Sequence, residues 1–124
     1  MSHLEINIVP DTLVFLPRET ICGKASWRLD DSPENVELRL FWYTSGMGTQ
    51  DVGIVEQISF DHPGLNDSRD FKFALPDAPY SFSGKLISLV WALELIRDKS
   101  KDVVRKEIIV SPIKQEILLT SKQL

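Results

Sequence analysis

The chain has 124 residues, of which 43% are hydrophobic and 26% are charged. This length and composition predict one globular domain over residues 1–124, with a core large enough to fold without metal or disulfide staples, and they exclude disorder over the whole chain. The formal net charge is −4. A nucleic-acid binder needs a basic surplus to neutralise phosphates, so we expect no nucleic-acid partner.

The cysteine count and the apolar runs bear on the compartment. The single cysteine, Cys22, cannot form an internal disulfide. The N-terminus has no basic segment followed by an apolar one, so no secretory leader is expected. The longest apolar run, 86–96, is interrupted by Ser88 and Glu94 and is shorter than the roughly 20 residues that span a bilayer. We expect a soluble, cytoplasmic protein without membrane insertion.

Apolar residues in the first third of the chain recur with the period of two that is typical of strands. Segments 4–8 and 24–29 alternate cleanly between apolar and polar residues, and 13–16 is a short apolar run. The segment 30–33, Asp-Asp-Ser-Pro, is a strong turn signal because Asp and Ser bond their own backbone and Pro fixes φ.

The middle of the chain continues this pattern. Segment 36–43 has one apolar face, and two glycines make 45–49 a flexible connector. Segment 52–60 is a predicted strand whose alternation breaks at Glu56, where a bulge would restore the phase. The loop 61–67 is rich in residues that break regular structure, and a further alternating strand follows over 70–75.

The segment 86–96 is compatible with a helix by composition, but a stripe of five apolar residues at period two favours a strand. With a polar turn at 98–102 and a β-branched run at 103–110, a hairpin explains the pattern. The tail 113–124 is left open between a last strand, a short helix and a disordered segment. About eight strands predict an all-β, immunoglobulin-like fold of two packed antiparallel sheets.

Two segments resemble the arrestin-like β-sandwich family. Residues 15–24, Phe-Leu-Pro-Arg-Glu-Thr-Ile-Cys-Gly-Lys, are similar to its aromatic-x-Pro-Gly-Glu-x-Ile-x-Gly segment, with Arg18 in place of glycine. Residues 79–93 are similar to its Pro-x-Ser-Phe-x-Gly-x-x-Ile-x-Val-x-Tyr segment, with Trp91 in place of tyrosine. Together they cover about a fifth of the chain, in the order and spacing of the N-terminal half of an arrestin.

The resemblance implies an arrestin-like sandwich and a protein-binding role. It does not imply receptor or phosphate recognition, because the sequence offers no counterpart to the family's paired phosphate-sensing lysines and no acidic cluster that matches its buried polar core. No functional residue is carried over from the family.

Searches for catalytic, metal and cofactor sites favour structural explanations. His3 and His62 are the only histidines, and the loop 61–67 lacks the ligand spacing of a zinc or calcium site. Cys22 has no neighbouring histidine and is interpreted as a small buried residue. We therefore expect no enzyme, metal or cofactor, with an unrecognised hydrolase as a remote alternative.

The aromatic residues divide into two groups. Trp27, Trp42 and Trp91 lie on the apolar phase of their strands and are assigned to the core. Phe41 and Tyr43 lie on the opposite phase, beside Arg39, and are candidates for contact with a partner.

The outer phase of 86–96 is the second candidate surface. It is too apolar for a face in contact with water, and its candidate contacts are Leu86, Val90 and Ile96. We hypothesise a homodimer built from a sheet edge or from the C-terminal tail. The leading functional hypothesis is a non-enzymatic interaction or scaffold domain with an unidentified protein partner. The alternative is a small-ligand or carbohydrate-binding module that uses the loops 46–48 and 61–67.

Overall fold

The structure, a computed structural model, describes residues 2–46, 48, 50–84, 86–99, 101–113 and 117–118, the last two by their backbone alone. The described part is built of strands, with no helix. The strands are β1 (His3–Ile8), β2 (Val14–Phe15), β3 (Thr20–Arg28), β4 (Val36–Gly46), β5 (Val52–Ser59), β6 (Asn66–Ala74), β7 (Phe82–Ser83), β8 (Ile87–Arg97), β9 (Asp102–Val110) and β10 (Ile117–Leu118).

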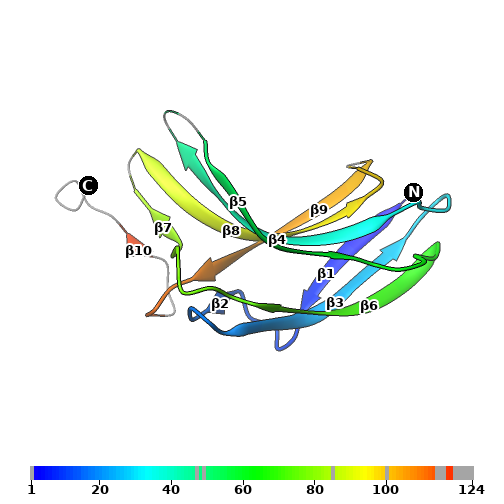
Figure 1. Ribbon diagram of the computed structural model, residues 1–124, viewed down its shortest axis with the longest axis horizontal. Helices are drawn as coiled ribbons and strands as arrows, with labels where there is room; N and C mark the ends of the chain where they lie inside the picture. Colours follow the sequence, from blue (N-terminus) through cyan, green and yellow to red (C-terminus); the bar gives the residue numbers. More distant parts are fainter. Residues whose placement is uncertain are drawn as a thin grey trace.

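Two sheets face each other across the core, with the short sheet below the long one in Figure 1. The short sheet has the order β1-β3-β6. The long sheet has the order β10-β7-β8-β4-β5, and β9 pairs with both β8 and β2. All pairings are antiparallel except β10 with β7 and β2 with β9. The all-β two-sheet sandwich expected from the sequence is confirmed.

The core lies between the inner faces of the two sheets, where alternate side chains of β3 and apolar side chains of β4, β6, β8 and β9 are buried. Trp27 and Trp91 are fully buried, and their indole N–H groups donate to the carbonyls of Gly64 (2.8 Å) and Pro79 (2.9 Å). Trp42 is half-buried and packs against the edge of the core. The assignment of the tryptophans to the core is confirmed, with Trp42 at its margin.

The ladder between β4 and β5 is interrupted by a bulge. Leu40 pairs with Glu56 whereas Phe41 pairs with Ile54, so Val55 is the extra residue on β5. This confirms the bulge expected beside Glu56. The bulge restores the alternation of β5. Val52 and Ile54 before the bulge and Gln57 after it all pair with residues on the outer face of β4.

The interpretation of Cys22 as a buried residue is wrong. In β3 the side chains of Ile21, Ala25 and Trp27 face the core, and the alternation of the strand turns Cys22 to the opposite face. Its side chain is exposed on the outer face of the short sheet.

The predicted hairpin over 86–110 is confirmed as β8 and β9, which pair from Trp91 to Arg97. In the tail, Ile117–Leu118 forms a strand that pairs with β7 in parallel, as one of the three interpretations proposed. Residues 114–116 and 119–124 lie outside the described residues, and the remaining predictions for the tail fall there.

The two segments that resemble arrestins are held in place by hydrogen bonds within the fold. The side chain of Glu19 accepts the N–H of Leu16 and closes the turn before β3. Arg18, where the family has glycine, has a φ of 68°, a conformation that glycine adopts at much lower cost. Farther along, the buried Ser81 accepts the Val110 N–H at Oγ (3.0 Å) and donates its own backbone N–H to the Val110 carbonyl (2.8 Å).

Candidate functional site

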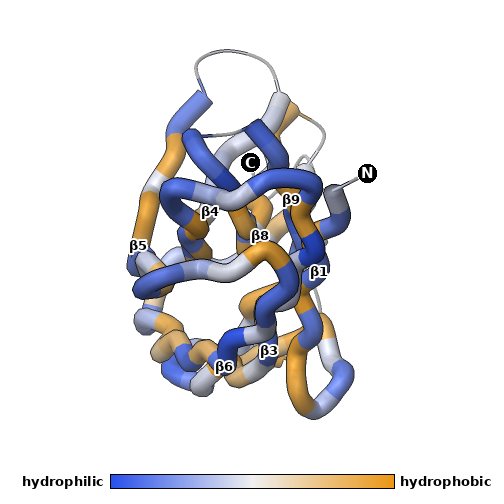
Figure 2. The backbone as a smooth tube through the Cα atoms, turned by 90° about the vertical axis from the view of Figure 1, so that its right-hand side faces the viewer, coloured by the Kyte–Doolittle hydropathy of each residue, from blue (hydrophilic) through white to orange (hydrophobic). Residues whose placement is uncertain are grey.

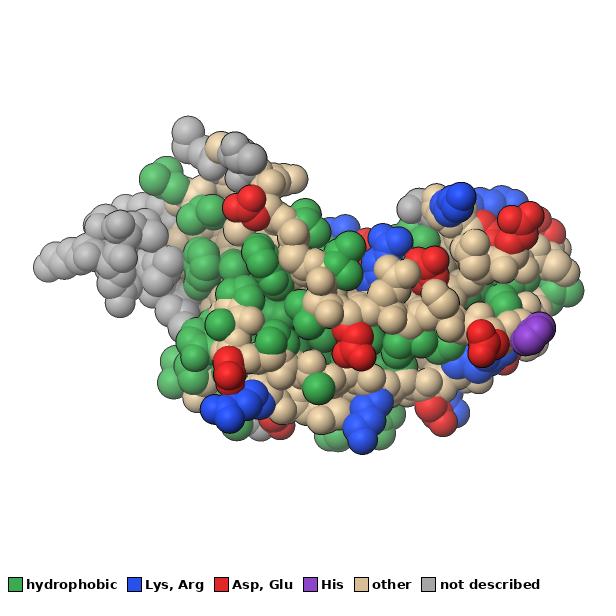
Figure 3. Space-filling view, in the orientation of Figure 1, with side chains coloured by type: hydrophobic (Ala, Val, Ile, Leu, Met, Phe, Trp, Pro, Cys, Tyr) green, Lys and Arg blue, Asp and Glu red, His purple; other side chains and the backbone are tan. Residues whose placement is uncertain are grey.

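The candidate binding surface is the outer face of the long sheet. Leu38 and Leu40 of β4 face the core, so Arg39, Phe41 and Tyr43 project from the opposite face. The long sheet curves, and this outer face is the upper, hollowed surface in Figure 1 and Figure 3.

The strand register assembles this surface from four strands. Phe41 lies between Ile54 of β5 and Ala92 of β8. Tyr43 lies between Val52 and Val90 in the next row. Arg39 lies between Gln57 and Glu94, and Glu94 is in turn opposite Arg105 of β9. Apolar and aromatic rows therefore adjoin a row of charged and polar residues.

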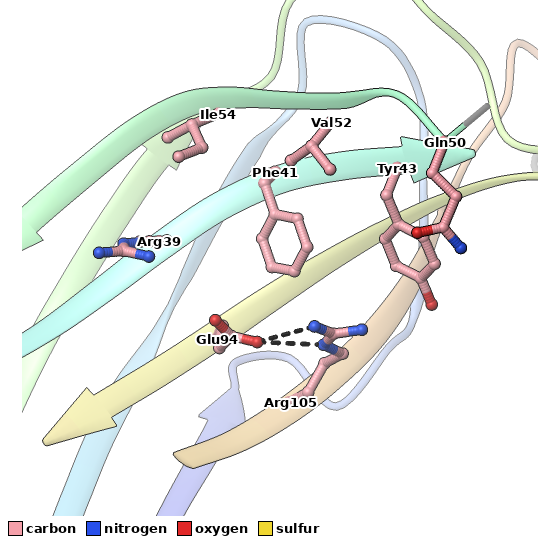
Figure 4. A pocket seen from close by; sticks show the side chains of 8 residues that line it. All are labelled: Arg39, Phe41, Tyr43, Gln50, Val52, Ile54, Glu94 and Arg105. Atoms are coloured by element: carbon pink, nitrogen blue, oxygen red, sulfur yellow. Dashed lines mark hydrogen bonds and ion pairs between the residues drawn. The ribbon is translucent and has the colours of Figure 1, made fainter. Parts of the chain in front are cut away.

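An aromatic–arginine cluster occupies the centre of this face (Figure 4). The rings of Phe41 and Tyr43 are stacked with centroids 6.0 Å apart. The guanidinium of Arg105 lies over both rings, 5.2 Å from the Phe41 centroid and 5.1 Å from the Tyr43 centroid. Cation–π contacts of this kind stabilise by roughly 0.5–1 kcal/mol at partly exposed sites.

Glu94 holds Arg105 in place. Its Oε2 accepts hydrogen bonds from Nη2 at 2.9 Å and from Nε at 3.2 Å. Burial acts to lower the pKa of Arg105, but the hydrogen bonds and charge of Glu94, together with Tyr43, outweigh it and raise the pKa. The cation over the two rings is therefore permanent.

The same residues border a groove of about 320 Å³. It runs between the β4–β5 hairpin and β9, and its lining residues are Arg39, Phe41, Tyr43, Gln50, Val52, Ile54, Glu94 and Arg105. Arg39 is held by hydrogen bonds to Gln57 (3.0 Å) and Glu37 (3.3 Å). The aliphatic side of the groove is open to solvent, since Val52 is 62% and Ile54 is 58% exposed.

The six residues proposed from the sequence do not form one patch. Arg39, Phe41 and Tyr43 line the groove together, but Phe41 is only 6% exposed, because Tyr43 and Arg105 lie against its ring. Val90 is half-buried beside Tyr43 and borders a separate depression with Leu13 and Ile109.

The other two candidates lie farther away. Leu86 is 58% exposed just before β8, beyond the last row of the groove. Ile96 is only 3% exposed, so the folded chain already covers it and we leave it out of the proposed surface.

Five residues of the groove were not predicted from the sequence. Val52 and Ile54 were recognised as strand residues, but only the register with β4 places them beside the aromatic rings. Glu94 and Arg105 could have been found from the sequence, because both lie on the outward phase of two strands that were predicted to pair. No sequence pattern pointed to Gln50.

A second polar constellation closes one end of the core. Arg97, the last residue of β8, is 1% exposed and donates to the carboxylates of Asp31 (2.7 Å), Asp98 (2.8 Å) and Asp102 (3.0 Å). Asp98 also accepts the backbone N–H groups of Glu34 and Asn35. This cluster was not predicted from the sequence, because its acidic residues come from the β3–β4 connection and from the β8–β9 hairpin.

This cluster connects the loop between β3 and β4 to the hairpin of β8 and β9. The hydrogen bond from Arg97, followed by that from Lys101, lowers the pKa of Asp31. Burial acts to raise the pKa of Asp98, but the N–H groups of Asn35 and Glu34 and the side chain of Arg97 outweigh it and lower that pKa.

The loops proposed for the alternative ligand site are separated, and the loop before β6 is closed by its own hydrogen bonds. They lie at opposite ends of β5, whose eight residues span roughly 25 Å. In the loop before β6, the carboxylate of Asp67 accepts bonds from Arg69 (2.9 Å) and from the Gly64 N–H (3.1 Å). Arg69, followed by Gly64, lowers the pKa of Asp67.

The part of the chain that the structure describes lacks two other kinds of feature. There, no group of three or more His, Cys, Asp or Glu side chains is arranged to hold a metal ion. Within the same residues, no helix is long and apolar enough to cross a membrane.

Comparison with known proteins identifies relatives of the fold. No protein-family profile and no curated protein matches the sequence. Among solved structures, Spo0M, a sporulation control protein from Bacillus subtilis, superposes with a TM-score of 0.59 and 15% identity. The match covers 89% of this chain and 49% of Spo0M, so the chain spans about half the length of that protein.

A β-glucosidase from Listeria innocua is also similar, with a TM-score of 0.49, 10% identity and coverage of 94% of this chain and 17% of the enzyme. Likeness at that level carries no inference about chemistry. The likeness to Spo0M shows a fold, and it agrees with the resemblance carried by residues 15–24 and 79–93. The chain therefore has an arrestin-like β-sandwich fold.

Proposed function

We propose that the chain is a non-enzymatic interaction or scaffold domain of arrestin-like fold that binds a partner protein on the outer face of its long sheet. The observation that carries the proposal is the Phe41–Tyr43–Arg105 cluster, in which Tyr43 and Arg105 offer accessible surface and cover the buried ring of Phe41. These side chains lie on the outward phase of their strands, where the core of the sandwich does not require large aromatic groups.

The composition of the groove suits a protein interface. Aromatic residues and arginine are enriched at the centres of interfaces and account for much of their binding energy. Here the rings and the guanidinium are fixed by mutual stacking and by Glu94, so little side-chain entropy is lost when a partner docks.

The charge balance of the groove indicates the chemistry of the partner. Arg105 is paired with Glu94, and Arg39 is paired with Glu37. Because these charges are matched within the chain, we propose that the partner offers an apolar or aromatic side chain. This side chain would rest against Val52 and Ile54, the exposed aliphatic wall of the groove.

The exposed free thiol of Cys22 fits a reducing compartment, where such thiols persist. We therefore propose a cytoplasmic location.

A carbohydrate-binding module is less well supported. Such a module needs accessible aromatic faces, but Trp27 and Trp91 are buried and Arg105 lies over the rings of Phe41 and Tyr43. The two loops that this alternative would use lie at opposite ends of β5.

The proposal is tested by comparative affinity purification from the native source, using three immobilised forms of the chain. These are the unmodified protein, the double variant Tyr43→Ala with Arg105→Ala, and the control Lys72→Ala, which alters an exposed residue of β6 in the other sheet. Proteins that are retained by the unmodified chain and the control but lost by the double variant are the expected partners. Each is then measured by calorimetric titration, where a loss of at least tenfold in affinity is expected. If no protein depends on Tyr43 and Arg105 for retention, the proposal is wrong.

A further inference from the structure

Within the described residues, β5 is the last strand on one side of the long sheet, and its segment before the bulge at Val55 lacks the charges and prolines that protect an edge. Residues 52–55, Val-Gly-Ile-Val, carry no charge and no proline, and Val52 and Ile54 are mostly exposed. One edge strand of the short sheet, β6, differs, since Asp67, Arg69 and Lys72 interrupt it. Figure 2 shows β5 along the outer margin of the molecule with hydrophobic stretches. An exposed, uncharged edge of this kind is a template for another strand.

The backbone of β5 offers hydrogen-bonding groups on that free side. The Thr44 N–H donates to the Asp51 carbonyl at 2.9 Å, which marks this pair as hydrogen-bonded. Pairs in an antiparallel ladder alternate between bonded and non-bonded, so Val52 and Ile54 form non-bonded pairs with β4. Their N–H and C=O groups therefore point away from β4, toward the open edge.

The same segment is complementary to itself. When two copies of β5 are placed antiparallel about a two-fold axis at Gly53, Val52 lies opposite the partner's Ile54, and Ile54 lies opposite the partner's Val52. These two pairs exchange four backbone hydrogen bonds. Asp51 then faces the partner's Val55, the bulge residue, so the regular pairing covers residues 52–54 of each copy. Gly53 meets the partner's Gly53 where the strands approach most closely.

We propose that the chain forms a two-fold homodimer through β5, in which the two long sheets become one continuous sheet. The second copy completes the groove. Tyr43, Val52, the partner's Ile54 and the partner's Phe41 form one row of side chains across the joined outer face, and the symmetric row repeats it. The dimer goes beyond the proposed function, because it forms without any partner protein. Contact through a short strand lies at the small end of interfaces, so we expect dissociation in the micromolar range.

A cross-linking experiment tests the register directly. Val52→Cys and Ile54→Cys are prepared separately in a Cys22→Ser background and oxidised alone or as an equal mixture. Opposed residues lie about 5.5 Å apart at Cα and can form a disulfide, whereas a residue and its own copy are diagonal, at about 7–8 Å. We expect a covalent dimer in the mixture and little in either variant alone. Equal cross-linking in all three samples, or none in the mixture, overturns the proposed register.

Sedimentation velocity tests the association itself. The unmodified protein is expected to shift from monomer to dimer between about 1 and 200 µM, a range set by the size of the contact. Ile54→Lys places a charge in the contact and is expected to stay monomeric, whereas Val103→Lys, at an exposed site of β9, is expected to dimerise normally. An unmodified protein that stays monomeric throughout, or an Ile54→Lys variant that dimerises equally well, would falsify the inference. Partner binding is measured separately with the Tyr43 and Arg105 variants, so failure of the dimer and failure of the proposed function are distinguished.

Discussion

Arg97 binds Asp31, a residue 66 positions earlier, through two acceptors at once. Its Nη2 donates to the backbone carbonyl of Asp31 at 2.9 Å and to the carboxylate at 2.7 Å. This contact fixes the connection between β3 and β4 against the hairpin of β8 and β9, and it closes one end of the core with a charged group in place of an apolar one.

Replacement of this guanidinium is expected to be costly. Arg97→Met removes the partner of three carboxylates that the loops hold in place. Breaking a buried pair costs about 3–5 kcal/mol, and because Asp31 is well exposed we expect roughly 2–3 kcal/mol here. Urea unfolding measures the loss. The control Arg28→Met, at an exposed position of β3, should change the free energy of unfolding by less than about 0.5 kcal/mol.

The same cluster predicts how stability depends on pH. The pKa values of Asp31 and Asp98 are lowered from their usual 3.8 in the folded chain. The unfolded chain therefore binds more protons below about pH 4, so the stabilising contribution is complete above that pH and is lost as the pH falls through the folded pKa values. Unfolding free energies measured from pH 6 to pH 2.5 should fall more steeply for the unmodified protein than for Arg97→Met. Equal slopes would contradict this account.

Arg18 offers a stabilising substitution. Its φ of 68° is unfavourable for a side chain with a Cβ, and Arg18→Gly is expected to raise stability by about 0.5–1 kcal/mol. The variant also loses an exposed ion pair with Asp77, which is worth little at the surface. Thermal unfolding of Arg18→Gly and Arg18→Ala separates the two effects, because only glycine relieves the backbone. A glycine variant no more stable than the alanine variant would show that the backbone is not strained here.

Gly53 is required by the ring of Trp42. A Cβ at position 53 would lie 2.3 Å from Cε2 of that indole, which is closer than atoms tolerate. Gly53→Ala is therefore expected to displace Trp42 from the margin of the core and to cost about 1–3 kcal/mol. Gly64→Ala is the matched control, since the nearest atom to its new Cβ would be 3.7 Å away. Tryptophan emission and denaturant unfolding would report both changes.

The position of Cys22 is checked by its reactivity. Because the thiol lies on the outer face of β3, a disulfide reagent should modify it completely in the native protein. If the thiol reacts only in denaturant, Cys22 is buried in the core, which would contradict the phase assigned to β3.

Much of this protein follows from local pattern. The alternation of apolar residues in β3, β4 and β8 determined which side chains enter the core, and it separated Trp27 and Trp91 from Phe41 and Tyr43. The phase of β3 also contained the answer for Cys22, which was misjudged because cysteine is so often buried. A period of two can be recognised in the sequence because successive side chains of a strand point to opposite faces of the sheet.

Tertiary structure decided what the strands do together. The sequence could not show that Arg105 lies over Phe41, or that Asp31 meets Arg97, because these contacts depend on strand order and register between distant segments. The exposure of Val52 and Ile54 likewise depends on β5 being the last strand of its sheet. The sequence by itself determined a two-sheet sandwich and the faces of its strands. Only the tertiary structure placed the groove and the open edge, because pairing between strands is a long-range choice that no single strand encodes.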